Sequence, residues 1–206
     1  MAIGRDADAA TAFEPAQEVI SRASGKDHLN VSGALVNLGA TQTRLGRPEL
    51  AITNLRRALE IKSAMFGADH EDVAWVSDLL GDALLAAGDP VLARASYERS
   101  LEAVQRLGGA DDPRTAYART GLARVARAVG NVPAARAHLE KALAIQNDDA
   151  PDEQRGDTRF ELAQVIADSD PERAKKLADE AVTAYRAAGA KGARGLAAAQ
   201  AWIAGR

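Results

Sequence analysis

The sequence lacks cysteine and has little histidine and few aromatic residues. It has 206 residues, of which three are histidines and eight are aromatic. Without cysteine there is no disulfide framework, iron–sulfur cluster, thiolate zinc site or thiol nucleophile. His28, His70 and His138 are too few and too far apart in the chain for a histidine metal centre. We therefore expect no metal and no cofactor.

An excess of one charge is also missing. The formal net charge is −3, whereas a face that binds phosphates leaves a clear basic excess. The first ten residues include Arg5, Asp6 and Asp8 where a signal peptide needs an apolar stretch. No window approaches the roughly 18 apolar residues that a membrane-spanning helix requires. These absences predict a cytoplasmic protein that binds neither nucleic acid nor membrane.

Alanine, by contrast, is abundant, with 47 residues in the chain. Alanine, leucine, arginine and glutamate favour helices, and β-branched and aromatic residues are sparse. Short breaks separate long stretches of helical periodicity, as in Leu45-Gly46-Arg47-Pro48 and Ala87-Gly88-Asp89-Pro90. Glycine just after one helix and proline at the start of the next indicate a tight helix–turn–helix. We predict an all-α fold.

These breaks recur with a fixed period. Gly46, Gly88 and Gly130 are 42 residues apart, and a series of alanines and leucines follows the same spacing. Such a period is the signature of a solenoid, in which each helix pair buries its apolar stripe only against its neighbours. The predicted segments are a partial repeat containing only a second helix (1–27), repeat 1 (28–69), repeat 2 (70–111), repeat 3 (112–152), a divergent repeat 4 (153–188) and a C-terminal capping helix (189–206).

The pattern Leu-Gly … Gly-x-Pro-x-x-Ala-x-x-x-Leu-x-x-Ala-Leu, from Leu38 to Leu59, resembles the tetratricopeptide repeat. The 42-residue spacing is similar to that of kinesin light chains, and Gly67-Ala68-Asp69-His70 resembles their linker, with Glu71 in place of proline. The last repeat also resembles the C-terminal arrays that follow serine/threonine kinase domains in bacteria, especially myxobacteria. The resemblance implies a right-handed α-solenoid of about ten helices with a peptide-binding groove.

Catalytic motifs are not found. The sequence has no Gly-x-x-x-x-Gly-Lys-Ser/Thr loop, no His-Glu-x-x-His and no Gly-x-Ser-x-Gly. His28 and His70 are repeat equivalents at the start of a first helix, where they can cap the helix or, alternatively, bind a ligand. We predict no catalytic residue.

The resemblance nominates groove residues on the first helix of each repeat. Asn37 is similar to the asparagine that holds a ligand's backbone in such grooves. Trp75 and Tyr117 are repeat equivalents that either anchor a partner or only pack against the adjoining helix. Arg124 and Arg127 can pair with an acidic ligand, or are ordinary solvated charges. The nominated set is Asn37, Thr43, Trp75, Asp78, Asp82, Tyr117, Arg124, Arg127 and Gln164.

The sequence therefore predicts a non-enzymatic module that binds a peptide or protein partner, as part of a larger bacterial signalling protein. The alternative is a scaffold segment that contacts a kinase or effector domain of its own chain, or a second copy. The half-repeat at Phe13–Ser24 favours the alternative, because its apolar stripe needs a cover and could form a homodimer.

Overall fold

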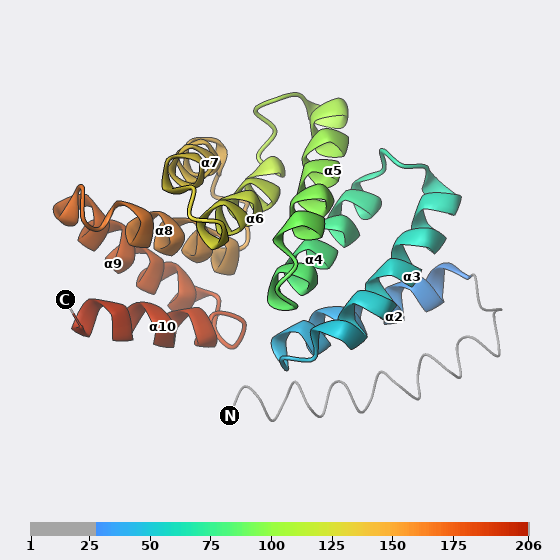
Figure 1. Cartoon of the computed structure of the whole chain (residues 1–206), viewed down its shortest axis with the longest axis horizontal. Coiled ribbons are helices and arrows are strands. Elements are labelled where there is room, and N and C mark those ends of the chain that lie inside the picture. The colour runs from blue at the N-terminus through green and yellow to red at the C-terminus, as the bar shows by residue number, and fades with distance from the viewer. Residues whose placement is uncertain (1–27, 206) are drawn as a thin grey trace. The chain divides into compact units, whose positions relative to one another are not determined.

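The computed structural model describes residues 28–205 of the chain (Figure 1). The partial repeat expected at 1–27 lies outside the described residues. The described part is all-α, as predicted, and contains no strand. It has nine helices: α2 (Leu29–Arg44), α3 (Pro48–Phe66), α4 (Glu71–Ala86), α5 (Pro90–Gly108), α6 (Thr115–Ala128), α7 (Val132–Ile145), α8 (Asp152–Ile166), α9 (Pro171–Ala187) and α10 (Ala193–Ala204).

The turns inside the pairs are built by the predicted glycine and proline. Gly46 lies in the turn between α2 and α3 and has a φ of 71°. Gly88 lies in the turn between α4 and α5 and has a φ of 81°. Only glycine adopts this left-handed region without steric cost. Pro48 and Pro90 then begin α3 and α5, where the missing N–H is not needed. The chain therefore reverses within a few residues and lays two helices side by side.

Two histidines cap the first helices of the first two pairs. The Nδ1 atom of His28 accepts a hydrogen bond from the Asn30 backbone N–H at 3.1 Å. The Nδ1 atom of His70 accepts one from the Asp72 N–H at the same distance. The His70 ring also stacks on Phe66, with 4.4 Å between centroids. The capping role predicted for these histidines is confirmed.

The described chain divides into two compact units, residues 28–109 and 110–205. In unit 1, glycine lets the two helices of each pair approach closely. A Cβ atom on Gly39 of α2 would lie 2.6 Å from the Cγ of Leu55 on α3, and Leu55 is fully buried. The equivalent pair in α4 and α5 is Gly81 and Tyr97. Small residues thus make room for one large side chain in each repeat.

Unit 2 has the same pairing and ends with α10, which packs on α9 and α8. Tyr185, near the end of α9, is 2% exposed. Its ring lies so close to Gly156 of α8 and Gly195 of α10 that a Cβ at either position would fall within 2.7 Å of it. Phe160 and Trp202 meet edge to face nearby, with 6.0 Å between centroids. The ring of Tyr185 therefore joins three helices.

In the part of the chain that the structure describes, no helix combines the length and the apolar character needed to cross a membrane.

Candidate partner-binding face

Each unit presents a face made by the first helices of its two repeats. In unit 1 these are α2 and α4, which contact each other, and in unit 2 they are α6 and α8. We call each the first-helix face of its unit. All nine nominated residues lie on these four helices, and the two faces are described separately.

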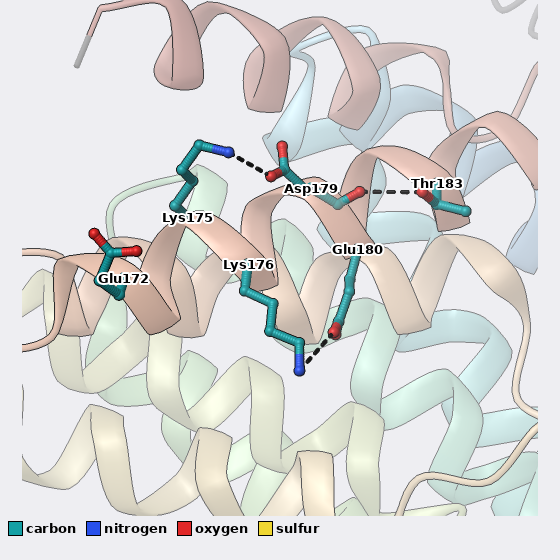
Figure 2. A pocket seen from close by; sticks show the side chains of 6 residues that line it. All are labelled: Glu172, Lys175, Lys176, Asp179, Glu180 and Thr183. Carbon is teal, nitrogen blue, oxygen red and sulfur yellow. Dashed lines mark hydrogen bonds and ion pairs between the residues drawn. The ribbon is translucent and has the colours of Figure 1, made fainter.

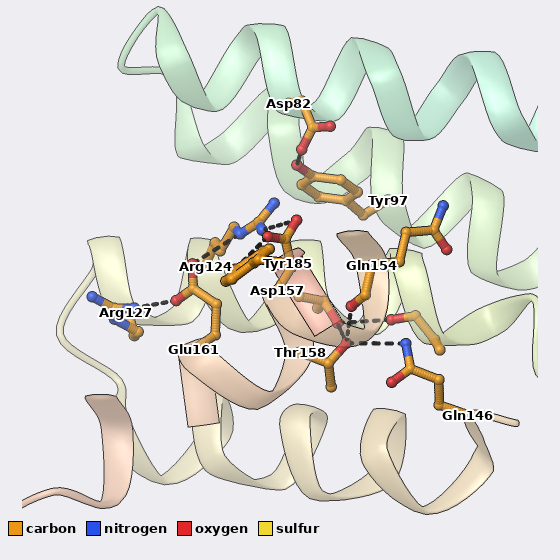
Figure 3. Close-up of polar contacts among 12 residues, drawn as sticks. Asp82, Tyr97, Arg124, Arg127, Gln146, Gln154, Asp157, Thr158, Glu161 and Tyr185 are labelled. Carbon is orange, nitrogen blue, oxygen red and sulfur yellow. Dashed lines mark hydrogen bonds and ion pairs between the residues drawn. The ribbon is translucent and has the colours of Figure 1, made fainter. Parts of the chain in front are cut away.

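The first-helix face of unit 1 carries an exposed aromatic and an exposed amide. The Trp75 side chain of α4 is 42% exposed, and Asn37 of α2 is also exposed. Thr43 is half-buried, and its hydroxyl donates to the Gly39 carbonyl of its own helix at 3.1 Å. The hydroxyl of Tyr97 donates to Asp82 Oδ1 at 2.6 Å, which holds this carboxylate against α5 (Figure 3). Trp75 and Asn37 are thus the most accessible of the nominated groups in unit 1.

Asp78 was predicted to be a groove residue, but the structure buries it. Its side chain is only 4% exposed, and its Oδ1 atom has no hydrogen-bond partner. Burial raises the pKa of this carboxyl well above its usual value, although a hydrogen bond with Ser100 on α5 lowers the pKa in part. Asp78 lies in the interface between α4 and α5 and does not present its carboxyl to a partner.

The first-helix face of unit 2 carries a network of paired charges (Figure 3). Arg124 of α6 contacts Asp157 at 3.1 Å and Glu161 at 3.0 Å, both on α8. Arg127 pairs with Glu161 and donates to the Gln164 side-chain oxygen at 2.8 Å. The structure therefore brings Arg124, Arg127 and Gln164 together. The charges of the two arginines are paired with Asp157 and Glu161 of the same chain.

A neutral polar contact lies beside this network. The hydroxyls of Thr120 on α6 and Thr158 on α8 are 3.0 Å apart and buried. Next to them is a small crevice between the two helices, lined by Tyr117, Thr120, Arg124, Gln154, Asp157 and Thr158. Tyr117 is half-buried at its edge. The crevice combines an aromatic ring with amide, hydroxyl and charged groups, which suits hydrogen bonding to a polar segment.

Tyr185 of α9 contacts the charge network through Asp157. Its hydroxyl donates to Asp157 Oδ1 at 2.7 Å, while the other carboxylate oxygen faces Arg124. Burial raises the pKa of the Tyr185 phenol, and the neighbouring Asp157 charge raises it further. The tyrosine therefore stays a donor and fixes the position of Asp157.

Two members of this network were missed by the sequence reasoning. Asp157 could have been found, because with the 40-residue offset of the last repeat it takes the place of Trp75 and Tyr117. Tyr185 belongs to a second helix, which the repeat register assigns to the opposite side. No sequence signal pointed to its contact with α8.

A shallow depression along α9 offers no convergent site (Figure 2). All its lining residues come from α9: Glu172, Lys175, Lys176, Asp179, Glu180 and Thr183. Lys175 pairs with Asp179 at 2.9 Å and Lys176 with Glu180 at 4.0 Å, both four residues apart on the exposed helix. Such pairs are ordinary features of a solvated helix. Among residues 28–205, no cluster of histidine and acidic side chains could hold a metal ion.

The sequence of these helix pairs matches the model of a known family. The sequence model of the family described as "Tetratricopeptide repeat" matches residues 1–64, 32–103 and 72–148, which together cover well over half of the chain. No match was found among curated proteins.

Solved structures share the fold at low sequence identity. BtubC (BKLC) from P. vanneervenii has a TM-score of 0.68 and 22% identity, over 85% of this chain and 74% of that chain. A Podosopora anserina protein described as a kinesin light chain with nearly identical TPR-like repeats has a TM-score of 0.65 and 19% identity, over 88% and 87%. NprR, solved in complex with its cognate peptide NprX, has a TM-score of 0.77 and 20% identity. That match covers 96% of this chain and 55% of NprR.

Proposed function

Because the chain belongs to the tetratricopeptide repeat family, we propose that it is a non-enzymatic module that binds an extended peptide segment of a partner protein on its first-helix faces. The observation that carries the proposal is the exposed Trp75 ring on the first-helix face of unit 1, next to the helix that bears the exposed Asn37 amide. A large aromatic side chain that stays exposed in the free protein is a typical anchor for binding. The peptide held by the structurally similar NprR supports the same use of the fold.

The polar groups on these faces suit the backbone of an extended segment. An amide side chain such as Asn37 both donates and accepts, so it can pair with a peptide carbonyl and a peptide N–H. Gln154 and Gln164 supply further amides on α8. These amides lie on helices that are already formed, so little backbone entropy is lost on binding.

The charge network changes the expected role of the arginines. Arg124 and Arg127 already pair with Asp157 and Glu161, so an acidic ligand would have to displace these carboxylates. We therefore assign the two arginines to shaping the face of unit 2, with polar backbone contacts as its contribution to binding. This replaces the acidic-ligand interpretation.

Selection of binding peptides tests the proposal. A display library of random 12-residue peptides is selected against the immobilised full chain, and enriched peptides are measured by fluorescence anisotropy. We expect Trp75→Ala and Asn37→Ala each to weaken binding by about tenfold, the scale of one well-placed contact. Leu92→Ala, which truncates an exposed side chain on the second helix α5, is the matched control. Enriched peptides that bind Trp75→Ala and wild type equally would contradict the proposal.

The proposal includes the setting that the sequence resemblance implies, a cytoplasmic module within a larger bacterial signalling protein. The coding sequence next to that of this chain tests this, because a kinase or other effector domain is expected there. Self-assembly is the competing function. Light scattering at several concentrations separates the two, since a strictly monomeric chain is incompatible with assembly through a second copy.

A further inference from the structure

Glu161 of α8 occupies the register position of Asn37 on α2. The 42-residue spacing of the first three repeats and the 40-residue offset of the last repeat relate the two positions. Asn37 is the exposed amide that is proposed to pair with a peptide backbone. An amide both donates and accepts hydrogen bonds, whereas an ionised carboxylate only accepts them. Repeat 4 therefore carries a negative charge where repeat 1 carries a neutral contact group.

The Glu161 carboxylate contacts both arginines of the charge network on the first-helix face of unit 2 (Figure 3). Its Oε1 atom accepts a hydrogen bond from Arg124 Nε at 3.0 Å, and its Oε2 atom accepts one from Arg127 Nη1. The Nη2 atom of Arg124 donates to Asp157 Oδ2 at 3.1 Å. Two neighbouring N–H groups of a guanidinium normally bind the two oxygens of one carboxylate. In Arg124 these donors are divided between two carboxylates of the chain itself.

This pairing works against an acidic side chain of a partner. Two arginines and two acidic residues leave the network neutral. The side chain of Arg127 is 38% exposed and that of Glu161 is 18% exposed, so a segment bound on this face meets both. An acidic side chain beside Arg127 would lie next to the Glu161 carboxylate, and like charges at close range cost free energy. It would also lose hydration, for which arginines that are already paired compensate only in part.

We infer that Glu161 is a specificity-determining residue: its carboxylate occupies the anion site that Arg124 and Arg127 would otherwise form, so the first-helix face of unit 2 selects uncharged over acidic peptide segments. The inference rests on the proposed function, because it concerns the peptides that the faces are proposed to bind. Discrimination of this kind comes from a group that penalises the wrong ligand. Asp157 contributes less to it, because the Tyr185 hydroxyl at 2.7 Å already satisfies one of its oxygens.

Glu161→Gln tests the inference on the full chain, because glutamine keeps the shape of the side chain and removes its charge. The probes are nine-residue glycine–serine peptides with blocked ends and three central residues, either all glutamate or all glutamine. Binding is followed by the NMR signal of the Arg127 Nε–H group, which Arg127→Lys assigns. We expect the glutamate peptide to shift this signal saturably in Glu161→Gln, with an affinity at least about threefold higher than for wild type, the scale of a partly exposed ion pair.

The glutamine peptide and a second variant provide the controls. The affinity of the glutamine peptide should change less than that of the glutamate peptide, whereas a general loosening of the fold would change both alike. Glu172→Gln makes the same change in net charge on the exposed surface of α9 and should leave the response to both peptides as in wild type. The inference is overturned if the glutamate peptide does not shift the signal in Glu161→Gln, or if it binds wild type equally well.

The outcomes for Glu161 and for the proposed function are distinguishable. If displayed peptides bind through Trp75 while Glu161→Gln does not favour the glutamate peptide, the peptide-binding function stands and the role of Glu161 is wrong. If Glu161→Gln binds the glutamate peptide as expected but no displayed peptide depends on Trp75 or Asn37, the occupied anion site stands without the proposed function.

Discussion

Replacing Asp78 by threonine should stabilise the protein at neutral pH. Threonine is the residue that repeat 3 carries at the equivalent position, where Thr120 is also 4% exposed and donates to the Ala116 carbonyl at 2.9 Å. It is close to aspartate in volume but brings no charge. Asp78→Thr therefore replaces a buried carboxyl, one of whose oxygens has no partner, by a hydroxyl that can bond within its own helix.

The size of the effect follows from two opposing contributions. A buried acceptor without a partner costs about 1–3 kcal/mol, and more when it is charged. The hydrogen bond between Asp78 and Ser100 is lost in the variant, at a cost of about 1 kcal/mol. We expect a net gain of about 1–2 kcal/mol in the free energy of unfolding at pH 7. For a chain of this size, that corresponds to a rise of roughly 2–8 °C in melting temperature.

The dependence on pH identifies the cause. The pKa of Asp78 is raised in the folded protein, so the folded state holds its proton more tightly than the unfolded chain does. The stability that this proton contributes is fully present below the unfolded value of about 3.9 and is lost as pH rises through the folded value. The advantage of Asp78→Thr should therefore grow with rising pH.

Urea unfolding followed by circular dichroism, at pH values from 4 to 8, measures this difference. The reciprocal variant Thr120→Asp should reproduce the effect with opposite sign in unit 2. A variant less stable than wild type at pH 7, or a stability difference that stays constant across the pH range, would refute the reasoning.

Three further substitutions test the packing. Gly81→Ala should destabilise by about 1–3 kcal/mol, because the new Cβ would lie 2.7 Å from ring atoms of Tyr97, and an unchanged urea midpoint would argue against this close approach. Ala93→Leu, at a position with no exposed surface, should cost about 1–3 kcal/mol by overpacking, and calorimetry should show a lower melting temperature. Tyr185→Phe should cost about 1–2 kcal/mol, since it keeps the ring and removes the hydrogen bond to Asp157; wild-type stability in urea would mean that this bond contributes nothing.

The sequence predicted the helices well, because repetition multiplies each local signal. A single Gly-x-Pro is weak evidence, but Gly46 and Gly88 occupy the same place in successive copies, and both lie in the predicted turns with positive φ. The periodic alanines were equally informative, since Ala51 and Ala93 recur with the 42-residue spacing and are both fully buried. Local propensity and long-range register pointed to the same fold.

The candidate site was less predictable, because register gives only the side of a helix. Position 78 lies at the border between the first-helix face and the contact with α5, and the neighbouring helices decide on which side of the border a side chain falls. Val36 and Phe160, at equivalent positions, already indicated an apolar environment there. The charge network depends on contacts between α6 and α8 and on Tyr185 from α9, which a one-dimensional period does not contain.

The matched charges on α6 and α8 also affect how fast a partner can arrive. Arg124 and Arg127 face Asp157 and Glu161 at close range, so their fields largely cancel a few ångströms from the surface. Long-range attraction accelerates association only where a surface keeps an uncompensated charge. Encounter with this face should then proceed at an unsteered rate of about 10⁵–10⁶ M⁻¹ s⁻¹ and change little with ionic strength. The lifetime of a complex here, rather than the speed of its formation, would set its affinity.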